Sequence, residues 1–149
     1  MKLPYRIACV VLALFAAGHT YGFLKFTPPT AEGLAVRDAM NQVHFQVKGA
    51  EYSYGGFYTG FGLFVTAYLL YSAVLAWQLG NLAEREPHTA RSLTWSLFAV
   101  QLVSLALSLM YFAAAPALLS AVVAACLAWG ASRRLRAQTA FSPAYVATE

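Results

Sequence analysis

The stretch that decides the fold is residues 93–132, LTWSLFAVQLVSLALSLMYFAAAPALLSAVVAACLAWGAS, forty positions without one Asp, Glu, Lys or Arg. Only lipid or a very large protein core tolerates such a run, and a chain of 149 residues is too short to build that core. As a single helix the run would measure about 60 Å, twice the roughly 30 Å of bilayer hydrocarbon. It therefore predicts two membrane crossings.

The reversal between these crossings is predicted at Pro116, because proline lacks an amide donor and fixes φ at a value suited to the start of a helix. Two further runs without formal charge are also long enough to cross a bilayer. The four predicted spans are, approximately, residues 7–24, 57–82, 93–114 and 117–131.

The composition of the whole chain agrees with this map, since 60% of the residues are hydrophobic, 11% are charged and the mean hydropathy is +0.56. We therefore predict an all-α fold, a transmembrane four-helix bundle. Residues 1–136 form one integral membrane domain and residues 137–149 a mobile tail. A cleavable secretory signal is the alternative for the first span, but the apolar run continues past Gly18 to Leu24, which favours a span.

The distribution of basic residues predicts the orientation, because Lys and Arg stay preferentially on the cytoplasmic side. With four spans, both termini and the second loop share one side, which carries seven Lys and Arg against three in the first loop. We predict the inner, cytoplasmic membrane of a cell, with both termini in the cytoplasm. The net charge of +4 is then explained by the orientation of the chain in the membrane. The sequence shows no combination of basic and aromatic residues of the kind that binds nucleic acid.

The loop between the first two spans, residues 25–56, has room for extracytoplasmic structure. Thr30 follows two prolines and is a suitable N-cap for a short amphipathic helix. One helical stripe could comprise Val36, Met40, Val43 and Val47. Apolar and polar residues also alternate from Val43 to Lys48 ahead of Gly49, which is typical of a hairpin. The sequence leaves helix and hairpin open for residues 43–54.

Small and hydroxyl residues recur at helical spacing on the first three spans, and such stripes let membrane helices approach closely and hydrogen-bond. The predicted helix-packing residues are Gly18, Gly22, Thr59, Gly62, Thr66, Ser104 and Ser108. Gln101 is the most polar side chain near the middle of a span. We interpret it as an interhelical hydrogen-bonding group, with a ligand contact as the alternative.

His19 is the only histidine within a predicted span and lies about one turn from its outer end. Ionisable groups in lipid tend to be functional. We predict that the outer mouth of the bundle binds a lipid-like or amphiphilic ligand, with its apolar body inward and its polar head on the histidine. The predicted ligand-binding residues are His19, Tyr21, Glu51, Tyr54, Tyr58 and Gln101.

Two other functions are compatible with the sequence. A small membrane enzyme could act on an isoprenoid or sterol-like substrate by acid–base chemistry, with His19 paired to Glu51 or Asp38. An accessory subunit or a homo-oligomer could instead dock a membrane partner through the small face of the second span. We expect no metal or cofactor, because the histidines have neither metal-site spacing nor the pairing on spans that haem requires.

Gly18-His19-Thr20 at the end of the first span and the sequence from Phe57 to Gly62 at the start of the second carry a resemblance. With the polar loop between them, they resemble an uncharacterised family of small bacterial four-span inner-membrane proteins. The similarity covers nearly the whole chain. It implies the four-span architecture and a bacterial inner membrane, and it adds no chemistry.

Overall fold

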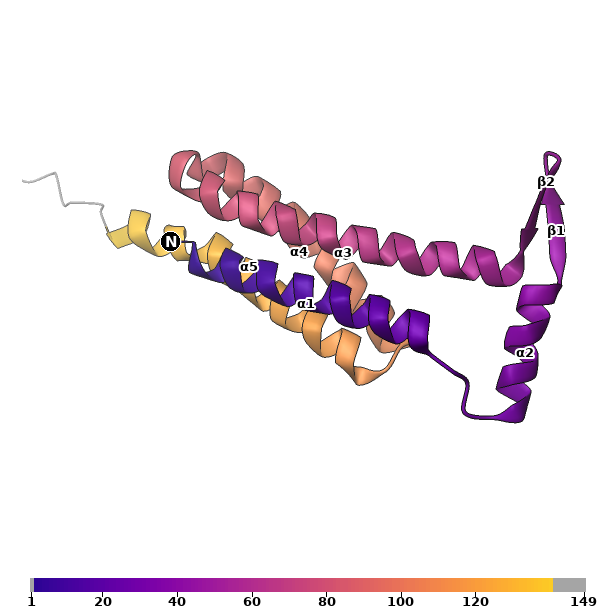
Figure 1. Ribbon diagram of the computed structural model, residues 1–149. Helices are drawn as coiled ribbons and strands as arrows, with labels where there is room; N and C mark the ends of the chain where they lie inside the picture. Colours follow the sequence, from indigo (N-terminus) through magenta and orange to yellow (C-terminus); the bar gives the residue numbers. More distant parts are fainter. Residues whose placement is uncertain (1, 141–149) are drawn as a thin grey trace, which may run out of the picture. The chain divides into compact units, whose positions relative to one another are not determined.

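The computed structural model describes residues 2–140, and side chains over residues 2–132. Within that range five helices and two strands follow one another (Figure 1): α1 (Leu3–Lys25), α2 (Ala31–Gln42), β1 (His44–Val47), β2 (Ala50–Ser53), α3 (Tyr54–Arg85), α4 (Pro87–Tyr111) and α5 (Ala114–Ala140). The segment predicted as a mobile tail, residues 137–149, is helical through Ala140 and beyond that lies outside the described residues.

Four of these helices, α1, α3, α4 and α5, are long and apolar enough to cross a bilayer. They leave many large apolar side chains exposed, and Leu14, Phe64, Leu109 and Met110 are each 66–74% exposed. Such a surface is unfavourable in water and ordinary in hydrocarbon, where a helix also satisfies its own backbone groups. The four helices are therefore compatible with a multi-pass membrane protein.

The chain divides into two compact units, of which the first contains residues up to Leu12 and from Ser72 onwards. It comprises the start of α1, the end of α3, and α4 and α5, which pack together as a helical hairpin (Figure 1). Its core is built largely of small and branched side chains, with Ala8, Leu12, Ala76, Leu79, Val123 and Leu127 at most 1% exposed. Small side chains allow the close approach on which helix packing in lipid depends.

Tyr5 connects α1 to the other three helices of this first unit. Its hydroxyl lies 3.2 Å from Thr94 Oγ1 on α4, and Thr94 in turn donates to the Ala90 carbonyl at 2.6 Å, so Tyr5 is the donor to Thr94. The Tyr5 side chain lies close against Gly80 on α3 and Gly130 on α5, where a Cβ would approach it to 3.1 and 2.9 Å. The start of α1, the α3–α4 connection and this part of α5 therefore lie at the same end of the unit.

Polar contacts accumulate at that end of the first unit. Lys2 Nζ lies 3.1 Å from Glu84 Oε2, and Arg6 Nη2 donates to Asn81 Oδ1 at 2.9 Å. The Arg6 guanidinium also lies 3.0 Å from the centre of the Trp77 ring, a cation–π contact. Such contacts hold charged groups near a membrane surface while their aliphatic stems cover apolar residues.

The second unit, residues 13–71, contains the rest of α1 and α3 together with α2, β1 and β2. Thr30 caps α2, because its side chain accepts a hydrogen bond from the Gly33 amide at 3.1 Å. The two strands pair antiparallel, with Phe45 opposite Tyr52. Residues 43–54, for which the sequence left helix and hairpin open, thus contain a hairpin, and the helical stripe ends with α2 at Gln42.

The hairpin is connected on both sides to its neighbouring helices. The Tyr54 amide donates to the Val43 carbonyl at 3.3 Å, which extends the strand pairing by one position. Gly55 is buried against the end of α2, and a Cβ there would collide with the Asn41 side chain. The end of α2, the hairpin and the start of α3 therefore form one connected structure.

The reversal between the last two spans needs a correction. It falls at Phe112 and Ala113, since α4 ends at Tyr111 and α5 begins at Ala114. Pro116 lies in the first turn of α5 and not at the bend. The first four amides of any helix lack an intrahelical acceptor, so a proline is tolerated throughout that turn and does not mark its first residue.

Candidate functional site

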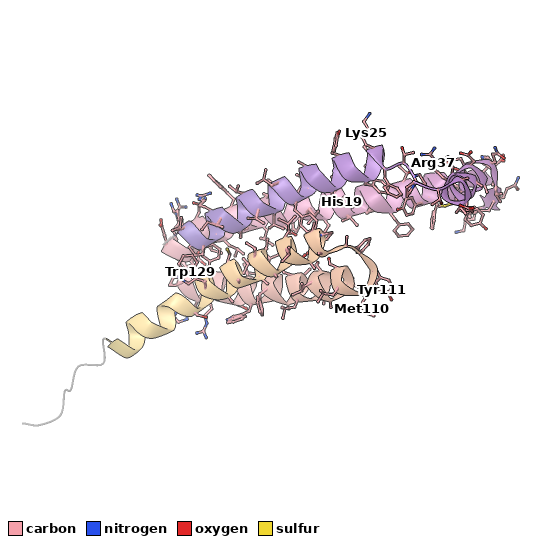
Figure 2. All side chains as sticks on the ribbon, turned by 90° about the horizontal axis from the view of Figure 1, so that it is seen from below. His19, Lys25, Arg37, Met110, Tyr111 and Trp129 are labelled. Carbon is pink, nitrogen blue, oxygen red and sulfur yellow. The ribbon has the colours of Figure 1, made fainter. Side chains whose placement is uncertain are left out.

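His19 joins α1 to α3 in the second unit (Figure 2). Its Nε2 atom lies 3.1 Å from the Gly62 carbonyl oxygen, and because a carbonyl can only accept, Nε2 carries the hydrogen and donates. The imidazole also stacks on the ring of Phe23, one turn further along α1, with centroids 5.7 Å apart and planes 7° from parallel. The half-buried His19 therefore binds backbone and ring within the protein.

Phe23 occupies the space that Gly62 leaves free on α3. A Cβ on Gly62 would collide with the Phe23 ring. Phe23 also contacts the Tyr58 ring, one turn before Gly62, with centroids 5.4 Å apart. Because glycine has no side chain, α1 can place an aromatic ring directly over the α3 backbone at this point.

A hydrogen bond between two threonines forms a second link between α1 and α3. Thr20 donates its hydroxyl hydrogen to the Ala16 carbonyl at 2.7 Å, and its Oγ1 lies 2.8 Å from Thr66 Oγ1, which itself lies 3.4 Å from the Gly62 carbonyl oxygen. By contrast, a Cβ on Gly18 or Gly22 would meet no described atom within 4 Å. Within this unit, Thr20 contacts α3 together with His19 and Phe23, whereas Gly18 and Gly22 make no such contact with described atoms within 4 Å.

An open groove of about 550 Å³ follows the α1–α3 contact of the second unit. Alanines and leucines form most of its lining, and Tyr21 and Lys25 lie toward the C-terminal end of α1, where Figure 2 labels Lys25. The lining residues are Ala13, Ala16, Ala17, Thr20, Tyr21, Leu24, Lys25, Thr66 and Leu70.

Most of these groove residues were missed by sequence reasoning, which singled out Tyr21 and Thr66 alone as site or packing residues. The available signal was the spacing of four between Ala13 and Ala17 and between Ala16 and Thr20, which puts small side chains on neighbouring positions of one helix surface. Lys25 gave a second signal, as the cation that ends an apolar helix.

The other predicted ligand-binding residues are distributed more widely. Tyr58 contacts Phe23, the ring on which His19 stacks, and Tyr54 contacts Phe45 of the hairpin, with ring centroids 4.9 Å apart. Glu51 lies exposed on β2, opposite Gln46. Gln101 belongs to the first unit, where it is only 1% exposed on α4.

The remaining predicted packing residues carry hydroxyl groups. Thr59 donates to the Gly55 carbonyl at 2.9 Å and Ser104 to the Val100 carbonyl at 3.1 Å, both within their own helix. Ser108 is 6% exposed in the first unit. Bonds of this i to i−4 kind give a hydroxyl an acceptor within its own helix.

The acid–base pair that a membrane enzyme would need is not among the described contacts of His19, which are Gly62 and Phe23. Asp38 is exposed on α2 and Glu51 on β2. Over the described residues, no group of three His, Cys, Asp or Glu side chains could hold a metal ion.

Comparison with known proteins found no match for this chain among protein-family models, curated proteins or solved structures. The class of protein is therefore defined by the chain itself, through its four helices of membrane-spanning length and composition.

Proposed function

We propose that this multi-pass membrane protein binds a lipid or lipid-like amphiphile with an anionic head group in the α1–α3 groove of the second unit. One observation carries the proposal: the groove has an apolar lining along most of its length and a lysine toward one end. This is the arrangement that an amphiphile with one long tail and one charged head requires.

The length of the groove supports a lipid tail as the occupant. From Ala13 to Lys25 the α1 wall extends about 18 Å at 1.5 Å per residue. One leaflet of hydrocarbon is about 15 Å deep, half of the bilayer's roughly 30 Å. A chain that lies along the groove would thus place its head near Lys25.

In this proposal the polar head lies at Lys25 and Tyr21 rather than at His19, the residue predicted from the sequence. His19 already donates to Gly62 and stacks on Phe23. In this proposal His19 is a positioning residue that maintains the helix contact beside the groove. Lys25 supplies the charge, and Tyr21, 72% exposed, supplies a hydroxyl and an aromatic surface at the same depth.

We also propose that the termini lie in the cytoplasm and that the chain belongs with the small bacterial four-span inner-membrane proteins that its sequence resembles. The excess of Lys and Arg in the end regions and the second loop supports the orientation. The groove, whose Lys25 end adjoins the first loop, would then lie in the outer leaflet.

Mass spectrometry of lipids that copurify with the protein in mild detergent tests the proposed groove. The variant Ala17→Leu fills the groove with an apolar side chain and should lower the amount of bound lipid per protein. Ala67→Leu is the matched control, because Ala67 is also exposed in the second unit and does not line the groove. Equal lipid content in the wild type and both variants would contradict the proposal.

The charge at the groove is tested with Lys25→Gln, which keeps a polar side chain of moderate length. One lysine near a membrane surface contributes about 1 kcal/mol to binding of anionic lipid, so affinity for phosphatidylglycerol should fall about fivefold. Affinity for phosphatidylcholine should change little. If the ratio of the two affinities is the same in the variant as in the wild type, Lys25 does not recognise the anionic head group.

A further inference from the structure

The β1–β2 hairpin has one apolar and one polar face. Directly opposite residues of an antiparallel pair project on the same side, so the register groups Phe45 with Tyr52 and Val47 with Ala50 on one face. The other face carries His44, Gln46, Glu51 and Ser53. The apolar face is open, with Val47 49% and Tyr52 50% exposed.

This apolar face continues without a break into the aromatic surface of α3. The Phe45 ring contacts Phe57 edge-on at 5.9 Å between centroids, and Phe57 contacts Phe61 in the same way at 4.8 Å. Phe57 and Phe61 are 55% and 58% exposed, on a helix apolar enough to span a membrane. The hairpin therefore extends a surface whose natural surroundings are lipid.

The backbone of the hairpin limits how deeply it can enter that lipid. Among residues 2–140, which the structure describes, each strand pairs with one neighbour, so both outer edges present N–H and C=O groups that hydrocarbon cannot satisfy. The head-group region supplies water and polar groups to these edges and still accepts aromatic rings, and Tyr is enriched there. Two strands alone are marginally stable in water, so contact with such a surface would also stabilise the hairpin.

We propose that the apolar face of the hairpin lies on the membrane, in the head-group region of the leaflet that α3 enters at Tyr54. The polar face then points to the aqueous phase. This inference depends on α3 spanning the bilayer and not on a ligand in the groove.

Spin labels on the two faces test the proposal in nanodiscs of phosphatidylcholine and phosphatidylglycerol. Single cysteines are introduced as Val47→Cys on the apolar face and Gln46→Cys on the polar face, after Cys9→Ala and Cys126→Ala remove the native thiols. Oxygen concentrates in lipid and a charged nickel chelate in water. The ratio of oxygen to nickel collisions should be several-fold higher for the Val47 label than for the Gln46 label.

Equal ratios for the two labels would overturn the proposal, because the two faces of the hairpin would then lie in the same environment. A Val47 label shielded from both reagents would also overturn it, since a protein partner or a second copy would then cover the face. A second measurement uses the unmodified chain: a lipid with a nitroxide near its head group should broaden the Phe45 and Tyr52 ring signals in NMR spectra. Sharp ring signals would again contradict the proposal, whereas the groove variant Ala17→Leu should leave both results unchanged.

Discussion

At the scale of single residues, the contact between α1 and α3 depends on the absence of a side chain at Gly62. The Phe23 ring lies over the Gly62 backbone, and His19 donates to the Gly62 carbonyl. The Tyr58 ring contacts Phe23 beside them. The glycine thus provides both the space for a ring and an accessible acceptor. In lipid, where association between apolar surfaces is weak, such close packing is the main source of helix–helix stability.

Gly62→Ala is expected to destabilise the protein by about 1–3 kcal/mol, the usual range for a side chain forced into occupied space. Gly60→Ala is the matched control, because a Cβ at Gly60 meets no described atom within 4 Å. The control should be neutral or gain up to about 1 kcal/mol in helix propensity. Thermal unfolding in detergent checks this, and equal midpoints for the two variants would contradict it.

The same residues show how much of the α1–α3 contact can be predicted from the sequence. His19 and Gly62 could be singled out from the sequence, since an ionisable side chain is unusual within an apolar span and small residues mark helix contacts there. Their meeting could not, because it depends on how each helix is rotated about its axis. The small-residue rule fits Gly18 and Gly22 on α1 just as well as it fits Thr20. Of these three residues, Thr20 is the one that contacts α3.

At the scale of elements, a two-residue turn at Lys48 and Gly49 sets the register of the hairpin. Lys48 and Gly49 both have positive φ, 49° and 84°, as a two-residue turn of type I′ requires. Glycine adopts this conformation freely. For lysine the left-handed region is unfavourable by about 1–2 kcal/mol, whereas asparagine tolerates it better.

Lys48→Asn should therefore stabilise the hairpin by roughly 1 kcal/mol or less. Hydrogen–deuterium exchange of the amides in residues 44–53 measures the effect, and exchange should slow. Lys48→Gln is the control, since it removes the same charge without favouring positive φ. If both variants protect the amides equally, the effect comes from the charge and not from the backbone.

The elements themselves were predictable to different degrees. Uncharged runs locate the four long helices because hydrocarbon excludes charge, but α1 and α3 continue past those runs to Lys25 and Arg85. Hydropathy reports the extent of hydrocarbon, whereas a helix ends where its hydrogen bonding ends. Residues Val43 to Val47 fit both a helical and an alternating pattern, so only pairing with β2 decides between them.

At the scale of the whole molecule, the four long helices are compatible with a multi-pass membrane protein, and the charge bias predicts the orientation proposed above. α3 contains 32 residues, enough for about 48 Å at 1.5 Å per residue, so its two ends can emerge on opposite sides of a bilayer. The hairpin precedes one end and the connection to α4 follows the other.

Cysteine accessibility in intact cells tests this topology. A membrane-impermeant maleimide should modify Lys48→Cys in intact cells and Glu86→Cys only after the membrane is opened, because the positive-inside rule places the second loop in the cytoplasm. Modification of Glu86→Cys alone in intact cells would invert the orientation. Modification of both would mean that α3 does not cross.

The contact of Tyr5 with Gly130 and Thr94 has a consequence for biogenesis. The first unit is assembled from the earliest turns of α1 and from helices that the ribosome delivers last, whereas residues 13–71 form an uninterrupted segment. The nascent chain can thus complete its middle section while translation continues. The opening turns of α1 are synthesised first, but their Tyr5 gains its partners on α4 and α5 only after α5 has been synthesised.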